Sequence, residues 1–464
     1  MIFTEARFLL FFALVFGVYW AVGNHRFRKV WLLLASYAFY AAWDWRFLSL
    51  IMGSTVLDYL VGLKLANTER PKRWIALSMF VNLGALGFFK YCNFFIDSGQ
   101  IFLGWLGLDV QASTLNIILP VGISFYTFQT MSYSLDIYYK KMEPVRDFLD
   151  LALFVAFFPQ LVAGPIVRAR DFLPQLTENK LFSNVHVRSA CMLFLIGYFK
   201  KMCVSDALIS TYADQFFAEP EKYDTLSTFL GVMCYTVQIY CDFSGYSDMA
   251  IATAALLGFK LCDNFSHPYL ASNITSFWRR WHMSLSSWLR DYLYIGLGGN
   301  RGSAWFRGRN LLLTMLLGGL WHGAGWNFIV WGGLHGVALM VHKGWNKLVG
   351  ERQPGIRVLL GWPITLYFVS ALWIFFRSES FEKAWLILKG FVLFDTKGAR
   401  ELPFNLIWVL VGLLMVHFIA RKGWMKPLLK RLPHWAFATL LGILAALALH
   451  FAASNTQPFI YFQF

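Results

Sequence analysis

The stretch VLLGWPITLYFVSALWIFF (358–376) contains no charged residue. Comparable apolar runs occur along the whole chain, at 8–22, 147–167, 404–420 and 435–453. Each approaches the ~20 residues that an α-helix needs to cross about 30 Å of hydrocarbon. A membrane-spanning β-strand would instead show ~10 residues of alternating polarity, which these runs lack. The sequence therefore predicts an all-α, polytopic integral membrane protein.

The composition agrees with a lipid environment. Of the 464 residues, 58% are hydrophobic and 14% are charged, whereas soluble proteins contain about 25% charged residues. The net charge of +15 does not indicate nucleic-acid binding, because the basic residues lie in short loops, as the positive-inside rule produces. We expect the basic segments 64–73, 279–309 and 421–431 to face the cytoplasm, and the mostly acidic loop 213–224 to face outward.

The chain is expected to form one membrane domain over residues 1–464, because no long polar linker interrupts it. The apolar runs predict roughly eleven to thirteen membrane segments, the short ones re-entrant or interfacial. No acidic residue, lysine or arginine follows position 431, so we expect the last helix to carry the tail PFIYFQF (458–464) to the outer face. The absence of an evident repeat weakens a transporter interpretation, since many secondary transporters consist of two related halves.

The segment SFWRRWHMSLSSWLRDYLYI (276–295) differs from the spanning runs. On a helix, its apolar residues share one face by i, i+3, i+4 spacing, which predicts a helix along the cytoplasmic interface. The apolar face comprises Trp278, Trp281, His282, Leu285, Trp288, Leu289 and Tyr292, and the other face comprises Arg280, Ser284, Ser287, Arg290 and Asp291. His282 is thus predicted to point inward, although interfacial helices also carry histidines without a function.

His322 is the first candidate for catalysis. It lies in NLLLTMLLGGLWHGAGWNFIVWGGLHGVALMVHKG (310–344), thirteen residues after Arg309, which corresponds to roughly 20 Å of helix. An ionisable group at that depth usually faces a polar cavity. A neutral imidazole there is suited to general-base catalysis. The alternative is a histidine that bonds a neighbouring carbonyl, with the nearby glycines serving helix packing alone.

Other motifs carry weaker signals. The segment GLGGNRG (296–302) lacks the strand and helix context of a phosphate-binding loop, so we expect a turn. His335 and His342 share a helix face but have no accompanying carboxylate, and we expect no metal site. In CDFSGYSDM (241–249), Asp242, Ser244 and Asp248 need partners in an apolar segment; a cavity lining and a structural ion pair both fit. The six cysteines are expected to be reduced and buried.

Five longer runs resemble the membrane-bound O-acyltransferase family, and within it the bacterial branch of alginate O-acetylation proteins. They are LPVGISFYTFQTMSYSLDIYY (119–139), FFPQLVAGPIVRARDFLPQL (157–176), YCDFSGYSDMAIATAALLGF (240–259), NFSHPYLASNITSFWRRWHMSLSSWLRDYLYIGLGGNRG (264–302) and LLGGLWHGAGWNFIVWGGLHG (316–336). The resemblance implies that His322 is the family's essential histidine and that His282 is its second characteristic polar residue. It also implies a ring of helices around a tunnel that joins the two sides of the membrane.

The resemblance further implies a reaction. Acetyl-CoA from the cytoplasm would be the donor substrate, with no permanently bound cofactor. Acetyl groups would pass across the bacterial inner membrane to a periplasmic acetyltransferase or a small membrane partner that modifies a polysaccharide such as alginate, cellulose or peptidoglycan. Five further residues are candidates for lining the tunnel or binding the donor: Trp321, Trp281, Asp242, Ser244 and Asn327. Two other hypotheses remain, a transporter or flippase for an acyl donor or lipid carrier, and a membrane anchor for a secretion complex.

Overall fold

The computed structural model describes residues 1–110, 113–162, 164–350, 355–423, 427, 431–453, 457, 459 and 460. These residues form helices joined by loops. Across that described part, β-structure amounts to one isolated bridge, between Tyr223 and Arg400. The expected all-α class is thus confirmed.

The chain divides into two compact units. Unit 1 comprises Met1–Cys191 and Ala250–Cys262, and unit 2 comprises Met192–Met249 and Asp263–Phe464. Two helices, α10 (Val187–Tyr198) and α12 (Thr225–Leu256), pass from one unit to the other. The single domain expected from the sequence remains a prediction.

Unit 1 is built from helices of mostly apolar sequence, several of which begin at a side-chain cap such as Asn24 or Asp147. Its elements are α1 (Ala6–Ala21), α2 (His25–Asp44), η1 (Trp45–Phe47), α3 (Leu48–Ala66), α4 (Pro71–Leu86), η2 (Gly87–Tyr91), α5 (Cys92–Trp105), α6 (Ile123–Tyr138), α7 (Phe148–Ala156), α8 (Phe158–Leu161), α9 (Ala169–Thr177) and η3 (Phe182–Asn184).

A buried carboxylate joins three helices of unit 1. Asp58 on α3 accepts hydrogen bonds from Ser78 (2.5 Å) and Asn82 (2.8 Å) on α4, and from Ser134 (2.7 Å) on α6. A carboxylate in an apolar interior is costly unless hydrogen bonds satisfy it. These three donors therefore hold α3, α4 and α6 together.

Unit 2 contains the candidate site. After α10 its elements are η4 (Phe199–Ile209), α11 (Ser210–Ala218), η5 (Pro220–Lys222), α12, η6 (Pro268–Leu270), α13 (Ile274–Trp278), α14 (Met283–Trp288), η7 (Leu289–Tyr294), α15 (Ala304–His322), α16 (Trp326–Val349), α17 (Gly355–Arg377), α18 (Phe381–Leu393), α19 (Leu406–Arg421) and α21 (His434–His450).

Two expected helices are wrong. The run 147–167 is not continuous, because the chain turns at Phe157 (φ −53°, ψ 107°) and Pro159 lies in the first turn of the next helix, α8. The segment 276–295 is not one interfacial helix but α13, a reversal at His282, α14 and the π-helical η7. Its apolar side chains are nevertheless buried largely as expected, whereas Ser284, placed on the opposite face, is buried too.

Within the described residues, three helical stretches are long and apolar enough to cross a membrane: His25–Ala66, Pro71–Trp105 and Gly355–Arg377. The last contains the run 358–376 and confirms that prediction. The helices α1, α19 and α21 are apolar but shorter. The larger number of membrane segments expected from the sequence stays a prediction.

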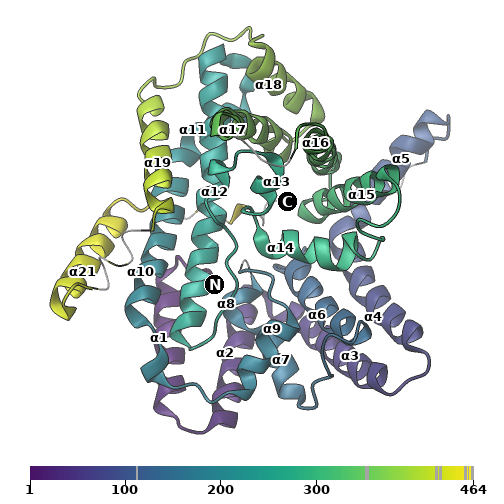
Figure 1. Ribbon diagram of the computed structural model, residues 1–464, viewed down its shortest axis with the longest axis vertical. Helices are drawn as coiled ribbons and strands as arrows, with labels where there is room; N and C mark the ends of the chain where they lie inside the picture. The colour runs from purple at the N-terminus through teal and green to yellow at the C-terminus, as the bar shows by residue number, and fades with distance from the viewer. Residues whose placement is uncertain are drawn as a thin grey trace. The chain divides into compact units, whose positions relative to one another are not determined.

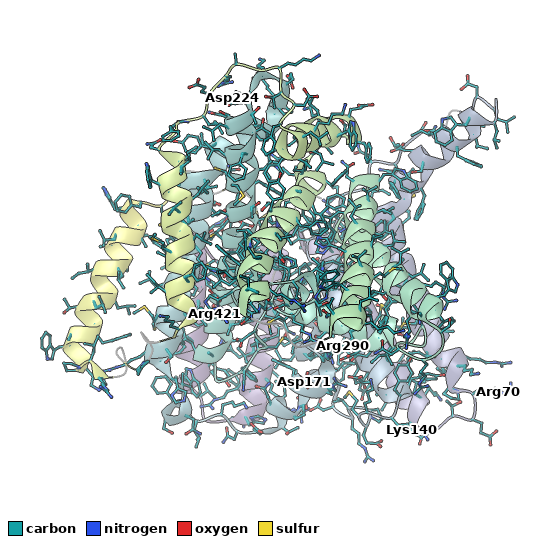
Figure 2. All side chains as sticks on the ribbon, turned by 45° about the horizontal axis from the view of Figure 1, so that its top comes forward. Arg70, Lys140, Asp171, Asp224, Arg290 and Arg421 are labelled. Atoms are coloured by element: carbon teal, nitrogen blue, oxygen red, sulfur yellow. The ribbon has the colours of Figure 1, made fainter. Side chains whose placement is uncertain are left out.

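Charged residues of opposite sign occur toward different ends of unit 2. Figure 2 shows Asp224, from the acidic loop 213–224, near one end of the unit, and Arg290 and Arg421, from two basic segments, toward the other. The expected placement of the acidic loop outside and of the basic segments in the cytoplasm stays a prediction. Two predicted segments lie partly outside the described residues. The basic loop 421–431 lacks 424–426 and 428–430, and the tail 458–464 lacks 458 and 461–464.

Glycines set the packing of α15 against α16, which are neighbours in unit 2 (Figure 1). A Cβ added to Gly319 would lie 2.1 Å from the carbonyl oxygen of Phe328, and one added to Gly332 would lie 2.2 Å from that of Met315. Only glycine allows these two backbones to approach so closely. The glycines of segment 318–336 therefore allow α15 and α16 to pack closely, and this packing positions His322 at the end of α15.

We predict that Gly319→Ala lowers the free energy of unfolding by about 1–3 kcal/mol, because the new methyl group meets a backbone carbonyl and forces the helices apart. Denaturant unfolding of the purified protein in detergent measures the change. Gly344→Ala on α16 is the matched control, since an added Cβ there meets nothing within 4 Å. Equal stability of the two variants would contradict the proposed close approach.

Candidate active site

His322 is the last residue of α15 and is 2% exposed. The helix is continuous from Arg309 to His322, so the expected separation of roughly 20 Å is retained. The helix ends because Gly323 is extended (φ −155°, ψ 150°). Trp331 on α16 and Phe376 on α17 pack against the His322 ring, with centroid distances of 5.1 and 5.4 Å.

His282 lies at a backbone reversal before α14 and is fully buried. Its φ of 43° and ψ of 54° are left-handed, a conformation that costs a non-glycine residue roughly 1–2 kcal/mol. Asn264 holds the reversal from both its backbone and its side chain. Its carbonyl accepts from the backbone N–H of Met283 (2.9 Å), and its Oδ1 lies 3.0 Å from His282 Nδ1 and accepts from Ser284 Oγ (2.9 Å).

The orientation of the Asn264 amide fixes the tautomer of His282. Asn264 Nδ2 donates to Ser247 Oγ (3.0 Å), and Oδ1 also accepts from the backbone N–H of Ser284 (3.4 Å). Because Oδ1 can only accept, His282 Nδ1 must carry the hydrogen. In the neutral ring, Nε2 is then the nitrogen that accepts a proton.

The two histidine rings are neighbours, with centroids 6.2 Å apart. Phe243 meets His282 edge to face at 4.6 Å, and Trp321 lies 5.9 Å from His282 and 5.1 Å from His322. Aromatic side chains thus pack around both imidazoles. The structure therefore brings together the two side chains that the sequence analysis singled out, and imidazole is a group able to accept and donate a proton.

The other candidates occupy different environments. Trp281 is fully buried and packs on Trp373 at a centroid distance of 4.9 Å, within the aromatic layer beside His282. Asp242 on α12 forms an ion pair with Lys201, and Ser244 is buried two residues further on. Asn327 donates to the carbonyl of Ser378 (2.9 Å) and links the start of α16 to the residue after α17, which is a structural contact.

The weaker motifs are also placed. His335 Nδ1 accepts from Trp278 Nε1 (3.3 Å), and His342 Nδ1 lies 2.9 Å from Thr275 Oγ1. No group of three metal-ligating side chains occurs among the residues described. The segment 296–302 turns, with positive φ at three of its glycines, as its sequence predicted.

Sequence reasoning missed Asn264 and Lys201. Asn264 is eighteen residues from His282, and no helical spacing connects the two. Lys201 did leave a signal, because a charged residue within the apolar run around 190–209 requires a partner. It lies 3.0 Å from Asp206 and also pairs with Asp242.

Comparisons with known proteins identify the family of the chain. The membrane-bound O-acyltransferase family model matches residues 144–381, which include both histidines. The chain is 41% identical to the probable alginate O-acetylase AlgI of Pseudomonas aeruginosa, covering 93% of this chain and 84% of that protein. It is 39% identical to the peptidoglycan O-acetyltransferase of Helicobacter pylori, covering 80% of this chain and 74% of that protein. It is 28% identical to the teichoic acid D-alanyltransferase of Bacillus subtilis, covering 58% of this chain and 71% of that protein. The chain therefore belongs to the membrane-bound O-acyltransferase family and is an O-acyltransferase.

Proposed function

We propose that this protein transfers acetyl groups from cytoplasmic acetyl-CoA, across the bacterial inner membrane, toward a system that O-acetylates an exported or cell-surface polysaccharide. The observation that carries the proposal is the pair of buried, adjacent histidine rings, one of them with a tautomer fixed by Asn264. The relatives named for alginate and peptidoglycan O-acetylation support the acetyl group and the polysaccharide.

The reaction needs one proton acceptor. An alcohol oxygen attacks the thioester carbonyl, so that a C–O bond forms and the C–S bond breaks. In this proposal His322 accepts the alcohol proton, which then passes to the departing thiolate of coenzyme A. His282 polarises or positions the reacting groups through Nε2. General acid–base catalysis of this kind contributes about 10²–10⁴-fold in rate.

The two ends of unit 2 suit the two substrates. The basic segments that contain Arg290 and Arg421 favour the phosphates of a cytoplasmic donor. The acceptor would approach from the end with Asp224, where a periplasmic acetyltransferase or a small membrane partner would receive the acetyl group. The C-terminus is proposed to lie on that same side.

His322→Ala is expected to reduce polysaccharide O-acetylation by at least about 10²-fold, because the proton acceptor is lost. Base-labile acetate on the polysaccharide of cells that carry the variant measures the effect, and immunoblotting of membranes verifies accumulation. His434→Ala is the control, since His434 is exposed at the start of α21. Full acetylation by His322→Ala would reject the role of His322. The transporter hypothesis has a separate test on the native protein: release of coenzyme A from acetyl-CoA only when an acceptor is present would exclude a transporter.

Asn264→Ala should lower kcat by about 10–100-fold, because His282 loses the partner that fixes its tautomer. The KM for acetyl-CoA should change little, which separates positioning of His282 from loss of donor binding. Ser247→Ala is the matched comparison: it removes the partner of Asn264 Nδ2 and leaves the contact with His282 Nδ1. We expect Ser247→Ala to lower kcat less than Asn264→Ala does. Equal decreases in kcat for the two variants would show that the whole hydrogen-bond network acts only on stability.

A further inference from the structure

Basic side chains gather at one end of α19 in unit 2. Arg421 is the last residue of that helix (Figure 2), and His417 precedes it by one turn. The His417 ring packs on Tyr240 of α12 (centroids 5.2 Å apart) and on His267 of the loop before η6 (5.0 Å). Lys200 Nζ lies 5.7 Å from the centre of the Tyr240 ring. Because residues four apart share a helix face, Arg421 belongs to the face of α19 that packs toward these side chains.

Arg280 also belongs to this basic cluster. The backbone N–H of Ser266 donates to the carbonyl of Arg280 (2.9 Å), so the backbone brings His267 next to Arg280. Besides burial, three positive charges lower the pKa of His267, namely those of Lys200, Arg280 and Arg421. Burial and the charge of Arg421 likewise lower the pKa of the Arg280 guanidinium. The two arginines are therefore close enough to repel each other.

The positive charges of the cluster exceed its negative charge. Asp248 is the carboxylate that acts on His267, and it pairs with Lys200 (2.7 Å). Neither Arg280 nor Arg421 forms an ion pair with any residue that the structure describes. Three cations and this one carboxylate leave two positive charges uncompensated. Like charges brought together in this way are unfavourable unless an anion binds between them.

The cluster is accessible to such an anion. Arg421 is exposed, and Arg280, His267 and Lys200 are each partly exposed. The planar guanidinium matches a phosphate group, to which it donates two parallel hydrogen bonds. Charge, exposure and the pair of arginines together indicate a ligand with a phosphate group.

The rest of α19 indicates the source of that phosphate. Residues 404–420 contain no aspartate, glutamate, lysine or arginine, so Arg421 marks the end of the apolar part of the helix, where an arginine side chain reaches the membrane interface. Away from the face with His417, large apolar side chains of α19 are exposed, and they comprise Trp408, Val411, Met415, Val416 and Ile419. Exposed apolar surface of this kind contacts acyl chains in a membrane. A phospholipid whose chains lie along α19 reaches the cluster with its phosphate.

We propose that the cluster of Lys200, His267, Arg280 and Arg421 binds the phosphate of an anionic phospholipid. Basic pockets beside membrane helices are suited to such head groups. The bound phosphate bridges α19 and the segment 264–280, which contains Asn264, the partner of His282. The inference goes beyond the proposed acetyl transfer and does not depend on that reaction.

The test measures the binding of single lipids to the full-length protein in detergent by native mass spectrometry. The probes are phosphatidylglycerol and phosphatidylcholine with the same acyl chains, because both contain a phosphate and only the first has a net charge. Two uncompensated positive charges should make the first phosphatidylglycerol bind about tenfold more tightly than phosphatidylcholine. Joint substitution of Arg280→Gln and Arg421→Gln should abolish this preference and leave phosphatidylcholine binding unchanged.

A charge-matched control uses the neighbouring basic residues. Arg279→Gln combined with Lys422→Gln removes the same charge from two exposed positions outside the cluster, and it should lower phosphatidylglycerol binding by less than about threefold. Arg421→Gln alone, at the exposed end of α19, should lower it about fivefold without any change in the segment 264–280.

Two outcomes would overturn the proposal. Equal losses in the cluster variant and in the charge-matched control would show that phosphatidylglycerol responds to net charge alone. Displacement of phosphatidylglycerol by coenzyme A, with coenzyme A binding lost in the same cluster variant, would assign the phosphate site to the donor and not to a lipid. Retained lipid preference in a protein without acetyl-transfer activity would support the lipid site while rejecting the proposed function.

Discussion

The hydrogen-bonded reversal at His282 is the constraint on which the candidate site depends. A histidine in the left-handed region is unfavourable by itself, and in an apolar interior its ring nitrogen also needs a partner. Asn264 meets both requirements, because its backbone carbonyl accepts from Met283 and its side chain engages His282 and Ser284. The backbone and the imidazole are therefore oriented by the same residue, and the proton-accepting nitrogen is defined before any substrate binds.

In both units, buried charged groups are stabilised by specific partners from neighbouring helices. In unit 1, Asp58 is surrounded by hydroxyl and amide donors from two other helices. In unit 2, Lys201 is compensated by Asp206 and Asp242, and these carboxylates also hold the C-terminal segment. Removing charged groups from water is costly unless each gains specific partners. The networks consequently fix which helices pack together, whereas apolar side chains alone would permit several arrangements.

The surroundings of buried side chains within unit 2 differ in polarity. The histidines lie among aromatic rings, with Phe243 against His282, and Trp331 and Phe376 against His322. A cavity elsewhere in unit 2 is, by contrast, lined mostly by charged and amide side chains, among them Lys201, Asp242 and Gln238.

The sequence by itself determined the fold class and the family, because apolar runs of membrane length and the motifs at 264–302 and 316–336 are local properties of the chain. It also singled out His282 and His322, whose catalytic roles stay predictions. It also located the turn at 296–302 and the glycines around His322. It predicted a continuous helix over 276–295, since its periodicity is helical, but the partner that breaks that helix, Asn264, is separated from it by a loop. Three features join segments distant along the chain: the neighbouring rings of His282 and His322, the ion pair of Lys201 with Asp242, and the polar cavity that this ion pair lines. Only tertiary packing decided these, because hydrogen-bond partners inside an apolar protein are chosen by distance in space and leave no periodic trace in the sequence.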